Sequence, residues 1–284
     1  MKRLIGIFSL VAAALFSFAV PAPAQSQIGL KQLTTGEADA VLAAFRAYRL
    51  PADSCMFFEI IHKPRKSDEE SVYEGTMWAK PLVSGTVIRL QIRKKGAAVS
   101  EEKKFIIRSG KQPALWQLNE KGEPEKINAE STQPFFSDLI FTPFDLQTPF
   151  LFWEKYEYDR TRRHRARPVH FFKMFPPEAF AGVNPEIGSV NIGFDRVYNA
   201  LVSAEVRNKD GKKLKSFSLG KVQKVQETYT FKELQLRDEV TRDRDTLVVR
   251  AAALHLELPK EFFLPENLSG STVEIPVEAF QLLD

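Results

Sequence analysis

The chain has 284 residues, and 40 Lys and Arg against 36 Asp and Glu give a formal net charge of +4. A nucleic-acid-binding domain would need a concentrated basic surface, which this near balance does not indicate, and we expect no nucleic-acid partner. A chain of this length can bury about three quarters of its unfolded surface without disulfides, and its single cysteine, Cys55, cannot form an internal one. We interpret Cys55 as a small buried apolar side chain rather than a reactive thiol.

The first 24 residues have the pattern of a secretory signal peptide. Lys2 and Arg3 precede an apolar stretch from Leu4 to Val20, and Ala22-Pro23-Ala24 fits a small-x-small cleavage site. An uncleaved membrane anchor is the alternative, although the stretch is marginal for a span of about 20 apolar residues. We therefore expect a periplasmic mature chain, residues 25–284, that forms a single domain. Removal of Lys2 and Arg3 lowers the formal charge from +4 to +2.

A helix is expected near the start of the mature chain. Thr34 and Glu37 form a capping-box pattern, in which each side chain satisfies an amide of the first turn. Leu50-Pro51 ends the helix. Between these points apolar residues recur at spacings of three and four, as one stripe that packs on a sheet. The stripe consists of Ala38, Val41, Leu42, Phe45 and Tyr48.

From Phe57 onwards the hydrophobic period changes to two. Between Thr86 and Lys94 three apolar residues alternate with Arg89, Gln91 and Arg93, which predicts a strand with one dry and one solvated face. Asp210-Gly211 predicts a tight hairpin turn. The absence of a long amphipathic crossover helix favours a mainly β (α+β) fold with an antiparallel sheet. Strands are predicted over 86–94, 105–108, 114–118, 169–175, 190–207, 213–219, 225–237 and 246–258.

The segment from Phe135 to Trp153, called the aromatic insert below, contains seven aromatic residues. Thr142-Pro143-x-Asp145 within it predicts a short helix, because a hydroxyl cap, an N1 proline and an acid all favour a helix start. The insert either walls a cavity for an apolar ligand or completes the core of the sheet. The residues predicted to contact an apolar ligand are Phe135, Phe136, Phe141, Phe144, Leu146, Phe150, Leu151 and Trp153.

Five arginines follow within eight residues, and they are called the arginine cluster below. One interpretation is contact with an acidic headgroup or an acidic partner, since guanidinium groups bind phosphate and carboxylate in a bidentate manner. The alternative is a solvated hairpin turn. The cluster consists of Arg160, Arg162, Arg163, Arg165 and Arg167.

The sequence contains no pattern typical of a catalytic or metal site. The four histidines do not have zinc-type spacing, and neither a G-x-S-x-G elbow nor an H-E-x-x-H helix is present. We therefore expect no enzymatic activity, no cofactor and no metal. An enzyme would need a reactive cluster assembled from distant residues, such as a buried His–carboxylate pair lining a cleft.

Several short motifs of the C-terminal half occur together. They are Arg167-Pro168-Val169-His170-Phe171-Phe172, the strand with Asp195 and Tyr198, Asp210 to Lys215, Lys221 to Lys224, Tyr229, Leu234-x-Leu236-Arg237-Asp238 and Thr246-Leu247. As a set, from about Phe135 onwards, they resemble the outer-membrane lipoprotein-sorting (LolA-like) family. The resemblance implies an open antiparallel β half-barrel, with an N-terminal helix and short helices plugging its mouth. The N-terminal half resembles the family only in its layout, and residues 259–284 extend beyond the last predicted strand.

The resemblance also implies a function. Better-known members of the family carry lipoprotein acyl chains from an inner-membrane transporter to an outer-membrane receptor. We therefore expect a monomeric, non-covalent carrier or binder of lipid or lipoprotein acyl chains. The alternative is an envelope sensor or interaction protein that binds another protein on the same concave β surface.

Overall fold

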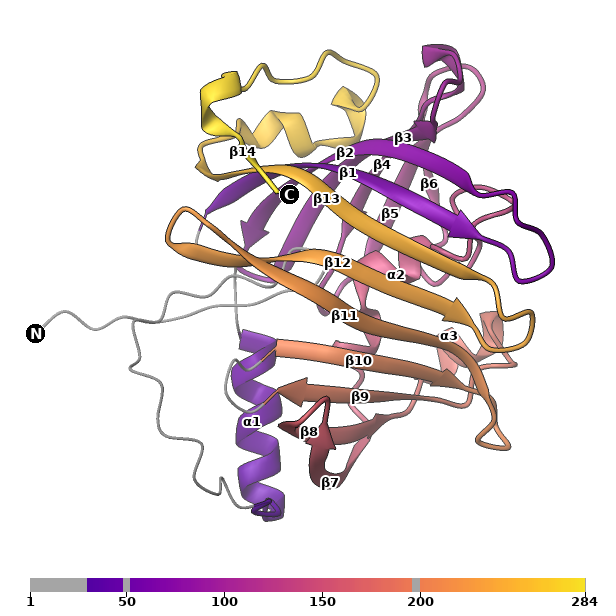
Figure 1. Ribbon diagram of the computed structural model, residues 1–284, viewed down its shortest axis with the longest axis vertical. Helices are drawn as coiled ribbons and strands as arrows, with labels where there is room; N and C mark the ends of the chain where they lie inside the picture. Colours follow the sequence, from indigo (N-terminus) through magenta and orange to yellow (C-terminus); the bar gives the residue numbers. More distant parts are fainter. Residues whose placement is uncertain (1–29, 48–51, 196–199, 284) are drawn as a thin grey trace, which may run out of the picture.

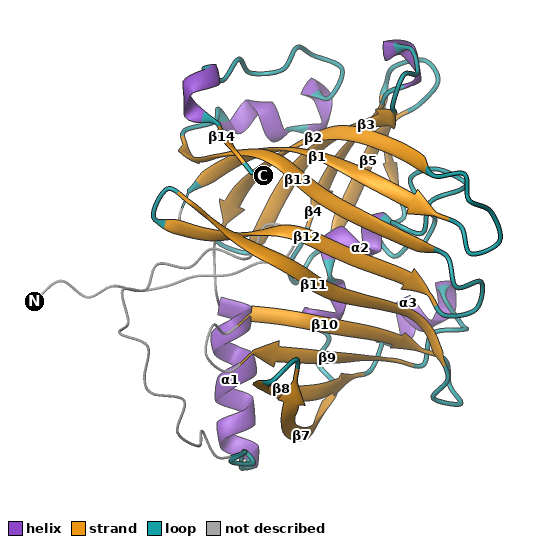
Figure 2. Cartoon of the chain, in the orientation of Figure 1, coloured by secondary structure: helices purple, strands orange, loops and turns teal. Residues whose placement is uncertain are grey.

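The computed structural model describes residues 30–47, 52–195 and 200–283. The predicted signal peptide, Tyr48, Leu50-Pro51 and Tyr198 lie outside the described residues. A single antiparallel sheet dominates the rest, and its strands follow the order β6-β5-β4-β3-β2-β1-β13-β12-β11-β10-β9-β8-β7, with β14 paired to β13. Figure 1 shows this sheet curling into an open half-barrel, and Figure 2 shows how few helices accompany it. The predicted fold class is confirmed.

The first half of the chain supplies one side of the half-barrel and the second half supplies the other. The strands are β1 Asp53–Lys63, β2 Ser71–Leu82, β3 Gly85–Lys94, β4 Lys103–Arg108, β5 Ala114–Leu118, β6 Pro124–Ile127, β7 Tyr156–His164, β8 Arg167–Met174, β9 Ser189–Asp195, β10 Ala200–Arg207, β11 Lys213–Val225, β12 Thr228–Asp238, β13 Arg244–Leu256 and β14 Gln281–Leu282. The α-helices are α1 Thr35–Ala47, α2 Pro143–Gln147 and α3 Glu178–Val183. The 3₁₀ helices are η1 Val99–Glu101, η2 Pro149–Phe152, η3 Lys260–Phe263, η4 Pro265–Asn267 and η5 Val277–Ala279.

Helix α1 begins as its sequence predicts. The Glu37 amide donates to Thr34 Oγ1 at 3.3 Å, and the Thr34 amide donates to Glu37 Oε2 at 2.9 Å, which completes the capping box. The apolar stripe packs on the sheet, with the Phe45 and Phe194 ring centroids 4.1 Å apart. The predicted Thr142 cap of α2 is also confirmed, because Thr142 Oγ1 accepts from the Asp145 amide at 3.3 Å.

Two predictions about the strands are wrong. The segment 190–207 forms two antiparallel strands, β9 and β10, rather than one. The polar face of β3 is not solvated, since Arg89 is fully buried and Gln91 is 9% exposed. The physical reason for the second error is that residues 259–283 fold back over the outer face of β1 to β5. This C-terminal segment buries Cys55 and Trp78 with Phe262 in a second, smaller core.

Arg89 organises the C-terminal segment. Its guanidinium donates to four backbone carbonyls at 2.9–3.1 Å, and its Cζ lies 4.2 Å from the centroid of the Phe262 ring. Burial lowers the pKa of Arg89. The sequence pattern of β3 predicts that Arg89 faces solvent. Its side chain instead holds the fold of the C-terminal segment, about 175 residues further along the chain. The four acceptors are the carbonyls of Phe262, Asn267, Leu268 and Gly270.

Candidate functional site

The aromatic insert lies in the main core, on the inner face of the half-barrel. Seven of its eight predicted ligand-contact residues are buried, and Phe136 is half-buried. Phe144 packs against Phe150 and against Phe180 of α3, with ring centroids 5.6 and 5.4 Å apart. Packing of this kind is what completion of the core requires. Ligand contact by these eight residues stays a prediction.

A buried acid holds the insert to the sheet. Asp245 of β13 accepts from the Ile140 and Phe141 amides at 2.7 and 2.8 Å through Oδ2. Its Oδ1 lies 2.7 Å from His62 Nδ1 on β1. Burial raises the pKa of Asp245, although the His62 ring and the two amides act in the opposite direction. This is a buried His–carboxylate pair, in which Oδ1 contacts the His62 ring and Oδ2 positions the backbone of the insert.

Other side chains anchor the insert from the remaining sides. Lys215 of β11 donates to the Ile140 carbonyl at 2.7 Å, and Lys103 of β4 donates to the Phe135 carbonyl at 2.7 Å. Arg46 of α1 donates to the Leu151 carbonyl at 2.6 Å. Both sides of the half-barrel and the N-terminal helix therefore contact the insert, which acts as a fixed plug of its concave face.

A pocket opens where the sheet separates between β10 and β11. These strands pair only from Ser203↔Ser218 to Arg207↔Lys213. Beyond Ser218, β11 continues to Val225 with β12 as its partner. β10 instead begins at Ala200, which pairs with Asp195 of β9. The pocket, about 250 Å³ in volume, lies at this separation.

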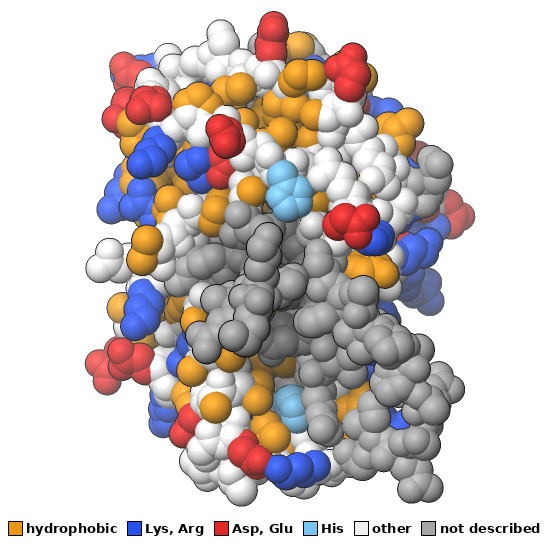
Figure 3. All heavy atoms as spheres, turned by 90° about the vertical axis from the view of Figure 1, so that its left-hand side faces the viewer, with side chains coloured by type: hydrophobic (Ala, Val, Ile, Leu, Met, Phe, Trp, Pro, Cys, Tyr) orange, Lys and Arg blue, Asp and Glu red, His pale blue; other side chains and the backbone are white. Residues whose placement is uncertain are grey.

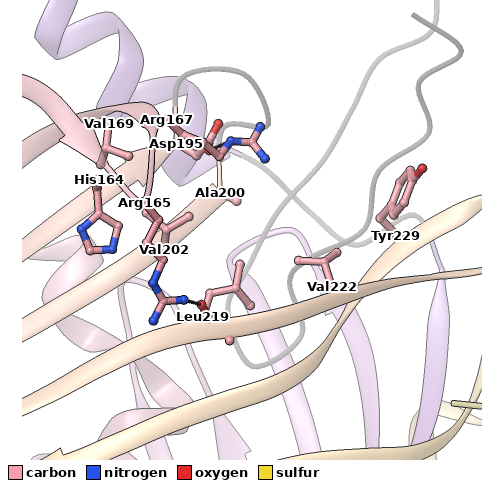
Figure 4. A pocket seen from close by; sticks show the side chains of 11 residues that line it. His164, Arg165, Arg167, Val169, Asp195, Ala200, Val202, Leu219, Val222 and Tyr229 are labelled. Carbon is pink, nitrogen blue, oxygen red and sulfur yellow. Dashed lines mark hydrogen bonds and ion pairs between the residues drawn. The ribbon is translucent and has the colours of Figure 1, made fainter. Parts of the chain in front are cut away.

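The pocket combines apolar walls with a basic rim (Figure 4). The rim comes from the turn between β7 and β8, where Arg165 has a left-handed φ of 47°. This turn reaches β11, because Arg165 Nη1 donates to the Leu219 carbonyl at 2.6 Å. The lining residues are His164, Arg165, Arg167, Val169, Asp195, Ala200, Val202, Leu219, Gly220, Val222 and Tyr229.

Among the described residues that line the rim, Arg165 is the cation whose charge no carboxylate balances. Arg167 Nε lies 2.7 Å from the buried Asp195 carboxylate, so these two charges cancel. Burial, together with the charges of Arg165 and Arg162, lowers the pKa of His164 from its ordinary value, which leaves the ring neutral at pH 7. The guanidinium of Arg165 is exposed and bonded to a neutral carbonyl. The pocket therefore favours a ligand whose polar end is an anion.

The structure divides the arginine cluster. Arg165 and Arg167 line the pocket, whereas Arg160 pairs with Asp159 at 3.1 Å and Arg162 stacks 4.1 Å from the Phe171 ring centroid. Arg163 is exposed on β7. The insert and the cluster are not brought together at the pocket. Figure 3 views the end of the molecule that lies at the left of Figure 1, where hydrophobic and basic side chains both reach the surface.

Sequence reasoning missed the apolar walls of the pocket. Val202, Leu219, Val222 and Tyr229 belong to ordinary strand patterns, and no local pattern marks the point where β10 and β11 part. A weak indication is Gly220, which sits at a register irregularity of β11, since glycine within a strand often marks a bulge.

The described residues include neither a candidate group of metal ligands nor a candidate membrane-spanning helix. Among residues 30–47, 52–195 and 200–283, His, Cys, Asp and Glu form no group of three or more that could hold a metal ion. The helices of the same ranges include none with the length and apolar character that a membrane crossing requires.

Comparison with known proteins identifies the fold. No protein-family model and no curated protein matches the sequence. A domain from Vibrio parahaemolyticus described as an outer membrane lipoprotein-sorting protein aligns with a TM-score of 0.67 and 13% identity, over 80% of this chain and 97% of that one. A DUF1329 family protein from Desulfovibrio piger aligns with a TM-score of 0.67 and 10% identity, over 81% of this chain and 96% of that one. A LolA superfamily protein from Nitrosomonas europaea aligns with a TM-score of 0.58 and 13% identity, over 80% of this chain and 97% of that one.

These identities are too low to carry a function from one protein to the other, and they establish the architecture. The shared fold covers about four fifths of this chain. The resemblance found in the C-terminal half of the sequence is confirmed at this level: the protein has the LolA-like fold.

Proposed function

We propose that the protein is a periplasmic carrier that binds, non-covalently, one acyl chain of an acidic lipid or lipoprotein at the pocket between β10 and β11. The observation that carries the proposal is the combination of apolar walls with the exposed guanidinium of Arg165 at the rim, which is bonded to a neutral carbonyl. The acyl chain would lie against Val202, Leu219 and Val222, and its anionic end would lie near Arg165.

The energetics favour an aliphatic chain over a rigid polar ligand. Each methylene that leaves water contributes about 0.8 kcal/mol, so a few buried methylenes supply appreciable affinity without specific hydrogen bonds. The pocket volume of about 250 Å³ lies just below the ~300–1,000 Å³ of pockets that enclose drug-sized ligands. As it stands, the pocket therefore accommodates one end of a long chain rather than a whole lipid.

The inner plug supports this placement. A second gap lies between the insert and β10–β11, next to Phe217, and its volume is only about 10 Å³. Phe217 borders this gap and Leu219 lines the pocket. The two residues occupy successive inward positions on β11, so the gap lies next to the pocket along this strand. The insert would then form the closed inner end of the site, with Phe144 and Phe150 behind the tip of the chain.

Two features support the cellular role that we propose, namely the sequence pattern of residues 1–24 and the LolA-like fold. A basic start, an apolar stretch and a small-x-small motif favour export. Transfer of the bound chain towards the outer membrane, from an inner-membrane transporter to an outer-membrane receptor, is the role that the family resemblance implies.

A fluorescence titration with dansyl-labelled undecanoic acid tests the proposal. Val202→Asp places a carboxylate in the apolar wall, and we expect it to weaken binding at least tenfold. Val83→Asp is the matched control, because Val83 is 97% exposed on the β2–β3 turn and its replacement leaves the pocket intact. Dodecanoate should displace the probe more strongly than dodecanol, since only the former is an anion.

Equal binding by the Val202→Asp variant and the wild type would overturn the assignment of the pocket. Failure of the wild type to bind the probe, together with one stoichiometric protein partner in a pull-down, would replace the carrier by an interaction protein.

A further inference from the structure

Among the described residues, no strand pairing joins the tip of the β11–β12 hairpin to the sheet on either side. On the pocket side, β11 leaves β10 after Ser218. On the other side, β12 pairs with β13 only from Glu233↔Val248 to Arg237↔Arg244. Residues 219–232 therefore form a two-stranded arm whose backbone ladder is internal. Figure 1 shows this hairpin, in orange, diverging from β10 below and β13 above.

The C-terminal strand fills the second separation. β14 pairs with β13 through Ala251↔Leu282 and Ala252↔Gln281, beyond the point where β12 departs. The Leu283 amide donates to the Arg250 carbonyl at 2.9 Å, and the Leu283 side chain is 3% exposed. β14 is therefore attached firmly to β13, and it lies beside the arm.

Gln281 links this strand to the arm. The Gln226 amide, in the hairpin turn, donates to Gln281 Oε1 at 3.0 Å. Gln281 Nε2 donates to the Lys224 carbonyl at 3.1 Å. One side-chain amide thus satisfies a donor and an acceptor of the arm's backbone, as a neighbouring strand would. On the opposite side, Arg165 satisfies the Leu219 carbonyl at 2.6 Å.

We infer that Gln281 is a positioning residue for the pocket, acting as a latch on the β11–β12 arm. Leu219, Val222 and Tyr229 of the arm form one wall, and Ala200 and Val202 of β10 form the other. The position of the arm therefore sets the width of the pocket. Both hydrogen bonds of Gln281 are exposed to solvent, so water can replace them while the ladder within the arm stays intact. Val225 and Phe231 of the arm are buried in the main core, so the motion that this exchange permits is a small shift of the arm.

The predicted effect of Gln281 on ligand kinetics rests on the proposed function. The restraint that Gln281 places on the arm does not depend on any ligand. If the arm opens the pocket more often, the association and dissociation rate constants rise by the same factor. Damage to the pocket walls instead raises the dissociation rate alone. The two rate constants therefore separate a positioning role from a merely structural one.

A distance measurement on the ligand-free protein tests the restraint directly. Spin labels are placed at Glu227→Cys in the hairpin turn and at Val83→Cys on the β2–β3 turn. Cys55 is left in place, because burial raises the pKa of its thiol to about 12 and protects it from the label. Gln281→Ala should broaden the distance distribution, and Gln281→Glu, which keeps the acceptor for the Gln226 amide, should broaden it less. Gln223→Ala is the matched control on the same hairpin and should match the parent.

Stopped-flow binding of dansyl-labelled undecanoic acid tests the consequence for the pocket. We expect Gln281→Ala to raise the association and dissociation rate constants together, by about threefold to tenfold, with a dissociation constant changed less than twofold. A distribution broadened by Gln281→Ala, together with a wild type that binds no probe, would leave the latch standing and refute the proposed function. An unchanged distribution, or unchanged rate constants in a protein that binds the probe, would overturn the latch and leave the proposed function in place.

Discussion

Replacement of Arg89 by Met tests whether one buried guanidinium holds the C-terminal segment to the outer face of the sheet. Met has similar length but no donors, so the carbonyls of Phe262, Asn267, Leu268 and Gly270 lose their partner. We expect the segment to detach more often while the half-barrel remains folded, because the main core lies on the opposite face of the sheet.

The magnitude can be worked from these contacts. Four hydrogen bonds at about 1 kcal/mol each contribute about 4 kcal/mol, and the Phe262 contact, 4.2 Å from ring centroid to Cζ, adds about 1 kcal/mol. Against this stands the cost of burying the guanidinium, about 2 kcal/mol after pairing, which Met does not incur. The net loss of about 3 kcal/mol corresponds to about a hundredfold increase in the population of the open segment.

Cys55 reports that opening without any added probe. It is buried in the same small core as Phe262 and Leu268, and burial raises the pKa of its thiol to about 12. At pH 8 the thiol is protonated and enclosed, so labelling by a disulfide reagent requires opening. We expect Arg89→Met to accelerate labelling about a hundredfold, with Arg89→Lys in between.

Arg93→Met is the control on the same strand, because Arg93 pairs with Glu74 at 2.7 Å near the surface and does not hold the C-terminal segment. Labelling of Arg89→Met within threefold of the wild type would refute the reasoning. Equal acceleration in Arg93→Met would show that any change in β3 loosens the segment.

Two further predictions concern the plug and the N-terminal helix. Asp245→Ala removes the acceptor of two insert amides and of the His62 ring, and urea unfolding should show a loss of about 3 kcal/mol or more; a loss below 1 kcal/mol would contradict an anchoring role. The ion pair with Lys31 and the Thr34 cap lower the pKa of Glu37 to about 2. Because this folded-state pKa is depressed, the capping contribution is present above pH 4.5 and is lost as the pH falls towards 2. The protection factors of α1 amides, which are corrected for the pH dependence of intrinsic exchange, should fall over that interval in the wild type and stay flat in Glu37→Gln.

The strand pattern could be predicted from sequence because alternation is a local property. β4, β5 and the capping box of α1 lie where the residues place them. The solvated face assigned to β3 was wrong because burial of Arg89 depends on residues 259–283, and nothing between Thr86 and Lys94 indicates that this segment folds back. An arginine in an alternating strand has the same local pattern whether water or a distant segment covers it.

The candidate site was only partly predictable. The composition of the insert indicated an apolar role, but its attachment depends on Asp245, which in sequence is one more acid in a charged stretch. The arginine cluster indicated an anion-binding turn, and two of its members, Arg165 and Arg167, line the pocket. The pocket itself arises where pairing between β10 and β11 ends, and strand registers are tertiary information.

The position of a bound acyl chain can be measured most directly by nuclear Overhauser effects between dodecyl phosphate and methyl-labelled Val and Leu side chains. Binding at the pocket between β10 and β11 predicts contacts from the alkyl chain to Val202, Leu219 and Val222, with the phosphate nearest to Arg165. Contacts confined to other methyl groups, or a spectrum unchanged by the amphiphile, would contradict it.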